Sequence, residues 1–245
     1  MANRYKVSLQ ISGEDMLFGG LQKNSFIDYP GKISCVLFCQ GCNFRCPYCH
    51  NPGLINMEKC PQLYEKDVYD FLISHREFLD GVVISGGEPT LHNDLADLFG
   101  KVKEIGYPVK LDTNGSRPDV LRSLIEKGLV DYLAMDIKTD PMLYSSLIMK
   151  NCLPENILAS IHAIMESGLP YEFRTTCVRP FINEENIRII SYLIRGARLY
   201  AIQQFHETGI LNPEFFKEKD RVFTDKDLQQ FRDIAAEWVQ DCIVR

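Results

Sequence analysis

Short apolar runs alternate with amphipathic stretches along most of this 245-residue chain. Each run has the length and composition of a strand that is buried on both faces of a sheet. The runs cover residues 33–38, 82–85, 109–112, 132–137, 171–177 and 199–204. Between them, apolar residues recur at helical spacing. Strand–helix units repeated in this way predict an α/β fold with a parallel sheet and right-handed crossovers.

The amphipathic stretches predict the helices and their ends. Their apolar stripes cover residues 68–79, 95–102, 120–125, 158–165, 187–194 and, near the C-terminus, 228–238. We expect Ser116 and Asn183 to be N-caps, because short polar side chains can accept hydrogen bonds from the first backbone N–H groups of a helix. Glycine tolerates the left-handed turn that ends many helices. It stands at four expected helix ends, Gly106, Gly128, Gly168 and Gly196.

Composition and charge narrow the class of protein. We expect one domain over residues 1–245, with a core at about 33–205, an N-terminal extension at 1–32 and a C-terminal helical cover at 206–245. A net charge of −6 gives no support to a general nucleic-acid or anionic-membrane surface. The N-terminus lacks the apolar segment of a signal peptide, and no stretch approaches the roughly 20 apolar residues of a membrane helix. A cytoplasmic protein is therefore expected.

Five of the nine cysteines lie within one short segment, at positions 35, 39, 42, 46 and 49. They are too close together for a disulfide framework, and clustered thiols in a reducing compartment more often bind metals or serve redox chemistry. Cys42, Cys46 and Cys49 follow the first predicted strand with C-x3-C-x2-C spacing. Three thiolates on one loop can ligate three corners of a four-iron cluster and leave the fourth iron open to a substrate.

Two other metal sites fit the same cysteines. Cys39 with Cys42, and Cys46 with Cys49, form the C-x2-C pairs of a structural zinc site. A ferredoxin-like electron carrier would use Cys39 as its fourth ligand. We expect Cys39 instead to end the strand as a small buried hydrophobe, and Cys35 to lie in the core. The remaining cysteines are isolated in the sequence, at Cys60, Cys152, Cys177 and Cys242.

Polar residues follow the next three predicted strands. Gly86 and Gly87 would let a ligand approach the backbone, and Glu88 could pair with an ammonium group, although a structural glycine turn is the simpler interpretation. The third and fourth strands end in polar residues, Asp112, Thr113, Asn114, Asp136 and Lys138. Side chains at the carboxyl ends of parallel strands build most barrel active sites. For residues 111–115, an Asn–Gly turn remains the alternative.

Two further residues are weaker candidates. Arg174 lies within a predicted strand, and a buried arginine needs a partner, so it is a candidate for binding a carboxylate. His206 follows the last predicted strand, where a histidine is most often a surface-loop residue.

Taken together, these motifs resemble a known family. The loop CNFRCPYCHNP is similar to the cluster loop of radical S-adenosylmethionine (SAM) enzymes, with Tyr48 directly before the third cysteine. Gly86–Glu88 resembles the element that binds the SAM amino group in that family, and LDTNG and MDIK look like segments that border the SAM pocket in glycyl-radical activases. His206 matches a histidine near the adenine in such enzymes. The similarity spans most of the chain and is greatest to activating proteins of anaerobic ribonucleoside-triphosphate reductase. Gln203–Gln204 departs from the Leu–Pro pair that would match a pyruvate formate-lyase activase better.

The resemblance implies a fold and an activity. The fold would be a partial (β/α)6 TIM-like barrel whose open side admits a substrate loop. Cys42, Cys46 and Cys49 would be the catalytic ligands of a [4Fe–4S] cluster. The resemblance assigns cofactor binding to Tyr48, His50, Gly86, Gly87, Glu88, Asp112, Thr113, Asn114, Asp136, Lys138, Arg174 and His206.

The implied reaction is the reductive cleavage of SAM to a 5′-deoxyadenosyl radical, which then installs a glycyl radical on a partner enzyme. Flavodoxin or ferredoxin would supply the electron, and anaerobic ribonucleotide reductase would be the protein substrate. Two alternatives remain open. One is a radical SAM enzyme that acts on a small molecule or nucleoside, and the other is a non-catalytic iron–sulfur or zinc protein.

Overall fold

A nine-stranded sheet organises the protein, as a computed structural model shows for residues 17–55, 63–149, 152–207, 209–216 and 221–245. The strand order is β3-β1-β2-β4-β5-β6-β7-β8-β9. Every neighbouring pair from β2 to β9 is parallel, whereas β1 pairs antiparallel with both β2 and β3. The strands are β1 (Leu17–Ser25), β2 (Ser34–Cys39), β3 (Leu63–Tyr64), β4 (Gly81–Gly86), β5 (Val109–Thr113), β6 (Tyr132–Asp136), β7 (Tyr171–Cys177), β8 (Tyr200–Gln204) and β9 (Cys242–Val244).

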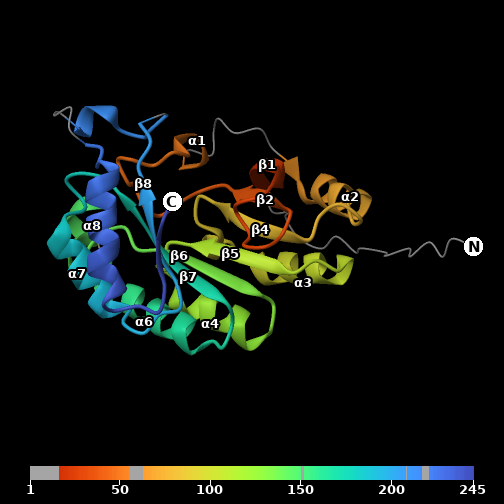
Figure 1. Ribbon diagram of the computed structural model, residues 1–245. Coiled ribbons are helices and arrows are strands. Elements are labelled where there is room, and N and C mark those ends of the chain that lie inside the picture. The colour runs from red at the N-terminus through yellow and green to blue at the C-terminus, as the bar shows by residue number, and fades with distance from the viewer. Residues whose placement is uncertain (1–16, 56–62, 150–151, 208, 217–220) are drawn as a thin grey trace, which may run out of the picture.

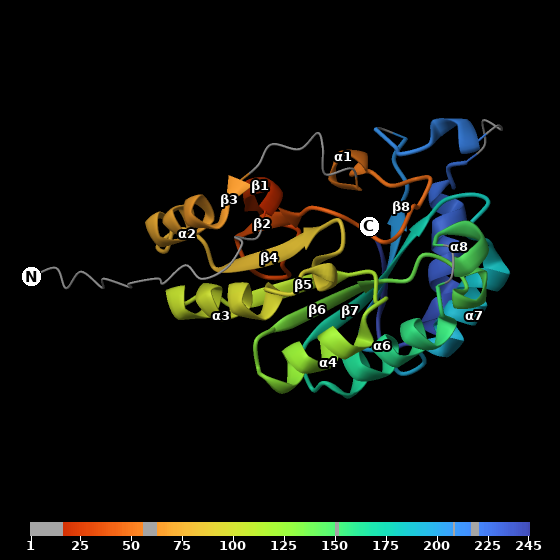
Figure 2. The same cartoon turned by 180° about the vertical axis from the view of Figure 1, so that it is seen from behind.

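The sheet curves, and helices α3, α4, α6, α7 and α8 follow its outer face (Figures 1 and 2). The α-helices are α1 (Pro52–Ile55), α2 (Glu65–Ser74), α3 (Leu95–Ile105), α4 (Pro118–Glu126), α5 (Tyr144–Leu147), α6 (Pro154–Glu166), α7 (Glu184–Leu193) and α8 (Asp225–Ala236). This arrangement confirms the predicted α/β class and partial barrel. Among the described residues, no helix combines the length and apolar character needed to cross a bilayer.

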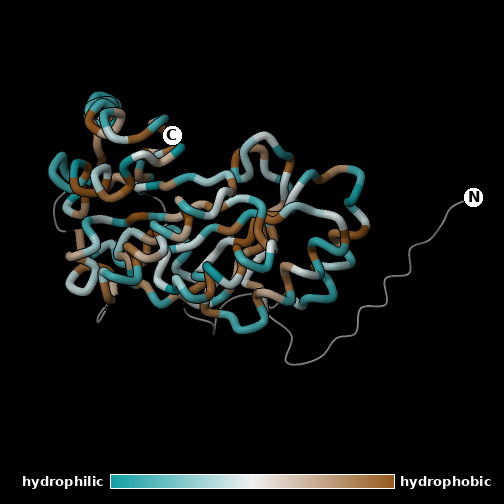
Figure 3. Tube along the Cα trace, turned by 90° about the horizontal axis from the view of Figure 1, so that it is seen from below, coloured by the Kyte–Doolittle hydropathy of each residue, from teal (hydrophilic) through white to brown (hydrophobic). Residues whose placement is uncertain are grey.

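Alternating side chains of the strands build two apolar layers. Leu37 and Ile84 are fully buried in the large core cluster, together with apolar residues of the outer helices. Val36 and Val83 point to the opposite face and pack with Tyr132 in a small inner cluster. Figure 3 shows hydrophobic segments in the interior of the trace and many hydrophilic ones in the peripheral turns. Both faces of the central strands are therefore covered, as the apolar runs predicted.

The sheet extends beyond the predicted core of about 33–205 at both ends. The region 1–32 contributes β1, and the expected C-terminal cover contributes β9 beside β8, whereas residues 1–16 lie outside the described part of the chain. The β1 sequence, LFGGLQKNS, contains two glycines and several polar residues, and β9 has only three residues. Neither segment carries the apolar run by which a buried strand is recognised.

The helix-end predictions have mixed outcomes. Asn183 is confirmed as an N-cap in a capping box. Its side chain accepts a hydrogen bond from the Asn186 N–H, and the Asn186 side chain accepts one from the Asn183 N–H. The prediction that Ser116 is an N-cap is wrong. Helix α4 begins after Arg117, and the Ser116 hydroxyl accepts a hydrogen bond from Asn43 instead. The helix predicted from the apolar stripe at 68–79 is too long at its C-terminal end. Helix α2 ends at Ser74, and Phe78 is 73% exposed. Each predicted terminal glycine follows its helix with a positive φ, at Gly106, Gly128, Gly168 and Gly196.

Candidate active site

A cavity of about 210 Å³ lies at the carboxyl ends of the parallel strands. It brings together every predicted site residue except Arg174 and His206. Phe44 of the cysteine loop lines it too, as do four residues that were not predicted, namely Asn51, Ile55, Ser85 and Thr176. Ser85 and Thr176 are polar residues near the carboxyl ends of β4 and β7, so the rule that selected Asp112 would have found them.

The three loop cysteines surround one side of this cavity as free thiols. Cys46 is buried, while Cys42 and Cys49 are partly buried. Burial raises the pKa of Cys42 to about 11 and that of Cys46 to about 12. Metal binding by these thiols must therefore release protons. In the described part of the chain, no three histidine, cysteine, aspartate or glutamate side chains are gathered around a single metal-ion position.

Hydrogen bonds and aromatic contacts hold the cysteine loop in place. The Asn43 side chain accepts a hydrogen bond from Asn114 Nδ2 (2.9 Å) and donates one to Ser116 Oγ (2.8 Å). Tyr48 is buried, and its hydroxyl donates to the Lys138 carbonyl oxygen (3.4 Å). Beside it, the imidazole of His50 stacks on Phe205. The loop is thus attached to the segments after β5, β6 and β8.

Cys35 and Cys39 lie where the sequence predicted. Both are fully buried, Cys35 within β2 and Cys39 as its last residue. Cys152 and Cys177 are also buried free thiols, and Cys242 begins β9. Cys60 lies outside the described residues.

Gly86 and Gly87 allow the end of β4 to touch the loop after β2. The Gly87 N–H donates to the Cys39 carbonyl (2.9 Å), and the Glu88 N–H donates to the Gly41 carbonyl (2.8 Å). A Cβ atom on Gly87 would lie 1.8 Å from the Gly41 oxygen, and one on Gly86 would lie 2.5 Å from the Cys39 nitrogen. The glycines are therefore required by the contact between two backbone segments, whatever ligand the cavity binds.

The Glu88 carboxylate joins the ends of β4 and β5. One oxygen accepts hydrogen bonds from the Thr113 hydroxyl (2.7 Å) and the Thr90 backbone N–H (3.1 Å), and the other from the Asn114 N–H (2.7 Å). The side chain is 1% exposed, and burial raises the pKa of its carboxyl. Both oxygens are thus held by the protein's own donors, which explains why this carboxyl tolerates burial.

Charged residues alternate along the inner face of β5, β6 and β7. Arg174 binds Asp136 (2.7 Å) and Asp112 (3.3 Å), while Lys138 binds the other oxygen of Asp136 (2.9 Å). Lys110, which is fully buried, binds the second oxygen of Asp112 at 2.5 Å. Although burial alone would raise the pKa of Asp112 and of Asp136, the neighbouring cations hold both below the usual range. Both carboxylates therefore reach the cavity in the ionised form.

A second layer of charge lies beneath this one. Glu172 is 1% exposed, and one oxygen is 4.0 Å from the Lys110 ammonium and 3.9 Å from the Arg174 guanidinium. Its other oxygen is 2.8 Å from Arg245, in an ion pair whose geometry does not form a hydrogen bond. Lys110, Asp112, Arg174 and Glu172 thus close a buried ring of alternating charge. The sequence signal was a charged residue at every second position of two buried strands, K-L-D in β5 and E-F-R in β7.

The structure places Arg174 and His206 away from the cavity lining. The guanidinium of Arg174 does bind carboxylates, but they belong to the protein's own Asp112 and Asp136. The His206 side chain is exposed, and its backbone carbonyl lies 2.6 Å from His50 Nε2.

Comparison with known proteins identifies the family. The model of the radical SAM superfamily matches residues 36–193. A glycyl-radical enzyme activating enzyme from Methanocaldococcus jannaschii is 36% identical over 238 residues, which cover 94% of this chain and 95% of that protein. The chain belongs to the radical SAM superfamily, among its glycyl-radical enzyme activating enzymes. A pyruvate formate-lyase-activating enzyme from Listeria monocytogenes is 32% identical over 159 residues, or 60% of this chain and 63% of that enzyme.

Solved structures share the fold of this radical SAM enzyme. SuiB from Streptococcus suis, bound to S-adenosylmethionine, aligns with a TM-score of 0.65 and 17% identity over 84% of this chain and 48% of SuiB. This chain thus spans about half the length of SuiB. QueE from Escherichia coli aligns with a TM-score of 0.54 and 14% identity over 94% of each chain. The partial barrel is therefore the one found in radical SAM proteins.

The family implies a [4Fe–4S] cluster and SAM as cofactors. The residues present fit both. Three soft thiol donors from one loop border a cavity, and thiolates are the usual ligands of iron–sulfur clusters. The lining of the same cavity also includes backbone at Gly86 and Gly87 and charged groups at Asp136 and Lys138, which suit the polar amino-acid end of SAM. Membership of this family excludes the two alternative interpretations of the cysteines, a structural zinc site and a ferredoxin-like electron carrier.

Proposed function

We propose that this radical SAM enzyme installs a glycyl radical on anaerobic ribonucleoside-triphosphate reductase in the cytoplasm, with flavodoxin or ferredoxin as the electron donor. The observation that carries the proposal is the single cavity in which the cysteine loop faces the ends of β4, β5 and β6. Three thiols, a glycine-rich backbone and paired charges meet there, which is the donor set that a cluster and SAM require together. The similarity of the cysteine loop and strand ends to ribonucleotide reductase activating proteins supports the choice of partner.

When bound, the cluster and SAM supply a one-electron cleavage of SAM whose 5′-deoxyadenosyl radical takes a hydrogen atom from a glycine of the partner. The protein's residues position these groups. Cys42, Cys46 and Cys49 would ligate the cluster. The backbone at Gly86 and Gly87 would receive the SAM amino group, with Glu88 keeping that segment in place through β5.

The charged wall would orient the rest of SAM. The Lys138 ammonium lines the cavity and would attract the SAM carboxylate, while Asp136 fixes the position of Lys138. Asp112, Thr113 and Asn114 would bind polar groups of the nucleoside. Arg174 would act by holding Asp112 and Asp136, and His206 by holding His50 through its carbonyl. Tyr48 and Phe44 are buried aromatic residues that would exclude water from the reacting groups.

Pyruvate formate-lyase is a second candidate partner. The Listeria relative that bears the name of its activating enzyme matches 60% of this chain. Gln203–Gln204 at the end of β8 differs from the Leu–Pro pair expected in such an activase, which favours the reductase.

The test is activation of each candidate by the anaerobically reconstituted enzyme. We expect about four irons per chain, as one [4Fe–4S] cluster requires, and SAM cleavage after reduction with dithionite. Incubation with the reductase should then produce the EPR doublet of a glycyl radical. A doublet with pyruvate formate-lyase alone would show that the proposed partner is wrong. An iron-free protein that leaves SAM intact would contradict the whole proposal.

A further inference from the structure

A second and larger cavity, of about 900 Å³, lies at the same edge of the sheet as the active site. Its walls come from the segment after β7, the first turns of α7 and α8, and, between β8 and α8, from Phe215, Phe216, Arg221 and Phe223. We call it the aromatic groove and define it by Arg179, Glu184, Glu185, Phe215, Phe216 and Arg221. None of these residues lines the cysteine cavity.

The aromatic groove is connected directly to the cysteine loop. The Asn212 N–H donates to the Pro47 carbonyl (2.9 Å), and the Leu211 N–H donates to the Cys49 carbonyl (3.1 Å). The wall that carries Phe215 and Phe216 therefore starts at hydrogen bonds to that loop.

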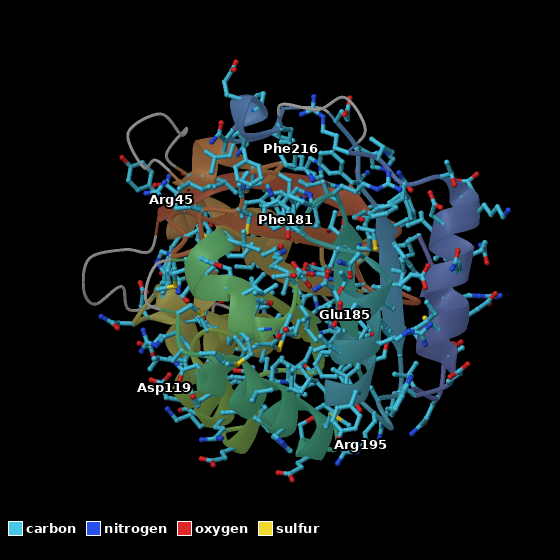
Figure 4. The ribbon with its side chains drawn as sticks, turned by 90° about the vertical axis from the view of Figure 1, so that its left-hand side faces the viewer. Arg45, Asp119, Phe181, Glu185, Arg195 and Phe216 are labelled. Carbon is cyan, nitrogen blue, oxygen red and sulfur yellow. The ribbon has the colours of Figure 1, made fainter. Side chains whose placement is uncertain are left out.

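An unbroken aromatic contact path leads from one cavity to the other. The rings of Tyr48 and Phe181 are 5.0 Å apart, and those of Phe181 and Phe215 are 5.5 Å apart. Figure 4 shows Phe181 and Phe216 near each other, above Glu185. Tyr48 lines the cysteine cavity and Phe215 lines the groove, so the ring of Phe181 contacts one lining residue of each.

The lining of the groove has the character of a protein-binding surface. Phe215 is a large aromatic residue that is 38% exposed. The guanidinium of Arg221 lies 5.2 Å from the ring of Phe216, and that of Arg179 lies 4.1 Å from a further phenyl ring in the wall. Aromatic residues and arginine are enriched at the centres of protein interfaces. Glu184 and Glu185 are exposed at the rim. Glu184 pairs with Arg188 (3.8 Å) and accepts a hydrogen bond from Gln230 (2.8 Å), and a basic side chain of a partner would find opposite charge at Glu185 beside it.

We propose that the aromatic groove binds the polypeptide segment of the partner glycyl-radical enzyme that flanks its reactive glycine. The proposal rests on the proposed function, because it requires a protein substrate. Hydrogen abstraction needs the glycine carbon within contact distance of the cavity, so the flanking residues of the partner must lie on the adjoining surface. The groove provides that surface. An apolar side chain of the segment packs against Phe215 and Phe216, and a basic one faces Glu184 and Glu185.

The experiment separates SAM chemistry from partner binding. The reconstituted enzyme and the variants Phe215→Ala and Glu185→Lys are compared in SAM cleavage without partner, driven by dithionite or by reduced flavodoxin. They are also compared in the EPR-detected rate of glycyl-radical formation at increasing partner concentration. Trp238→Ala is the matched control, because Trp238 is 37% exposed and lies outside the groove. The partner is a glycyl-radical enzyme that gives the doublet with the wild-type enzyme.

We expect Phe215→Ala to raise the half-saturating partner concentration by at least about tenfold, as loss of an interface anchor does. Glu185→Lys should raise it less, and more strongly at low salt than at high salt. SAM cleavage without partner should stay unchanged in both variants, and Trp238→Ala should match the wild type in both assays.

Three results would overturn the inference while leaving the proposed function intact. One is an unchanged half-saturating concentration in both groove variants. Another is an equal loss of dithionite-driven SAM cleavage, which would mean that Phe215 only supports the cysteine loop. The third is a loss confined to flavodoxin-driven cleavage, which would assign the groove to the electron donor. Absence of a glycyl radical with the wild-type enzyme and every candidate partner would instead overturn both.

Discussion

Burial does not distinguish the three loop cysteines from the other described thiols, because several of those are buried too. What distinguishes the loop cysteines is that they line the cavity. Cys46 and Cys152 are each 7% exposed, yet only Cys46 lines the cavity. Burial raises the pKa of both thiols above the usual value. The role of a cysteine here therefore follows from its place at the strand ends and from the loop that carries it.

This difference gives a matched pair of variants. Cys46→Ala should prevent full iron incorporation and abolish SAM cleavage, because the cluster loses one of three ligands. Cys152→Ala removes an equally buried thiol and should retain both properties. Iron content and SAM cleavage after anaerobic reconstitution measure the outcome. If Cys46→Ala still cleaved SAM at the wild-type rate, the ligand assignment would be wrong.

Glu88 makes a second residue-scale prediction, which concerns pH. Burial raises the pKa of its carboxyl, so the folded protein binds that proton more tightly than the unfolded chain does. Its contribution to stability is therefore complete below the unfolded pKa of about 4.3 and is lost as pH rises through the folded value. The glutamine side chain of the Glu88→Gln variant does not titrate, so this loss of stability is absent. Above about pH 4.5, the free energy of unfolding should therefore fall less steeply with pH in the variant than in the wild type.

Urea unfolding of both proteins between pH 4.5 and 8 would measure this slope. Other titrating groups are shared by the two proteins and cancel in the difference. A constant difference in stability between variant and wild type across that range would refute the assignment.

At the scale of elements, the end of β4 is determined by close packing against the loop after β2. The Gly87 N–H and the Glu88 N–H both donate to carbonyls of that loop. This contact fixes the distance between the glycine-rich strand end and the cysteines that follow. A side chain at position 87 would separate the two segments, because its Cβ would lie 1.8 Å from a carbonyl oxygen.

Gly87→Ala should therefore displace the cysteine loop. We expect SAM cleavage to fall by roughly 100-fold, the usual scale for a misplacement of about 1 Å at a reacting centre. Gly100→Ala in α3 is the control, since no atom other than its chain neighbours and the backbone of its own helix lies within 4 Å of the new Cβ. It should keep full activity and stabilise the helix by about 0.5–1 kcal/mol. Full activity of Gly87→Ala, by the same assay, would show that the loop adapts.

At the scale of the whole molecule, the inside of the curved sheet is charged at the height of the active site and apolar below it. The apolar end contains Val36, Val83 and Tyr132. Above them, Lys110 and Glu172 begin a network that reaches the cavity through the next residues along β5, β6 and β7. Strands that are distant in the sequence are thereby held together by ion pairs in the interior of the barrel.

Lys110 is a fully buried cation of this network, and its removal should be costly. Lys110→Met removes the cation nearest to Asp112 and leaves Asp112 and Glu172 with only the neighbouring arginines, so it should lower the free energy of unfolding by about 3–5 kcal/mol. Lys103→Met breaks the pair with Asp131, in which both side chains are about one-third exposed, and should cost at most about 1 kcal/mol. Urea unfolding at pH 7 compares the two. Equal losses would contradict a structural role for the buried network.

Local patterns were sufficient to predict much of this enzyme. Six parallel strands, the cysteine loop after the first of them and most of the cavity lining followed from periodicity, spacing and the rule that parallel strands place polar residues at one edge. These features are encoded by residues close together in the chain. Strands β1, β3 and β9 were not predicted, because they lack an apolar run and form only by pairing with a neighbouring strand.

The sequence by itself therefore determined the fold class, the position of the cysteine loop and the family. Only the tertiary structure decided which charges meet. Arg174 and Asp112 are 62 residues apart in the chain and share one ion pair, so Arg174 supports the cavity wall from behind. Position 87 must be glycine because the Gly41 carbonyl, in the loop after β2, lies where a Cβ atom would stand. Such contacts depend on how separate segments pack, and no local pattern contains that information.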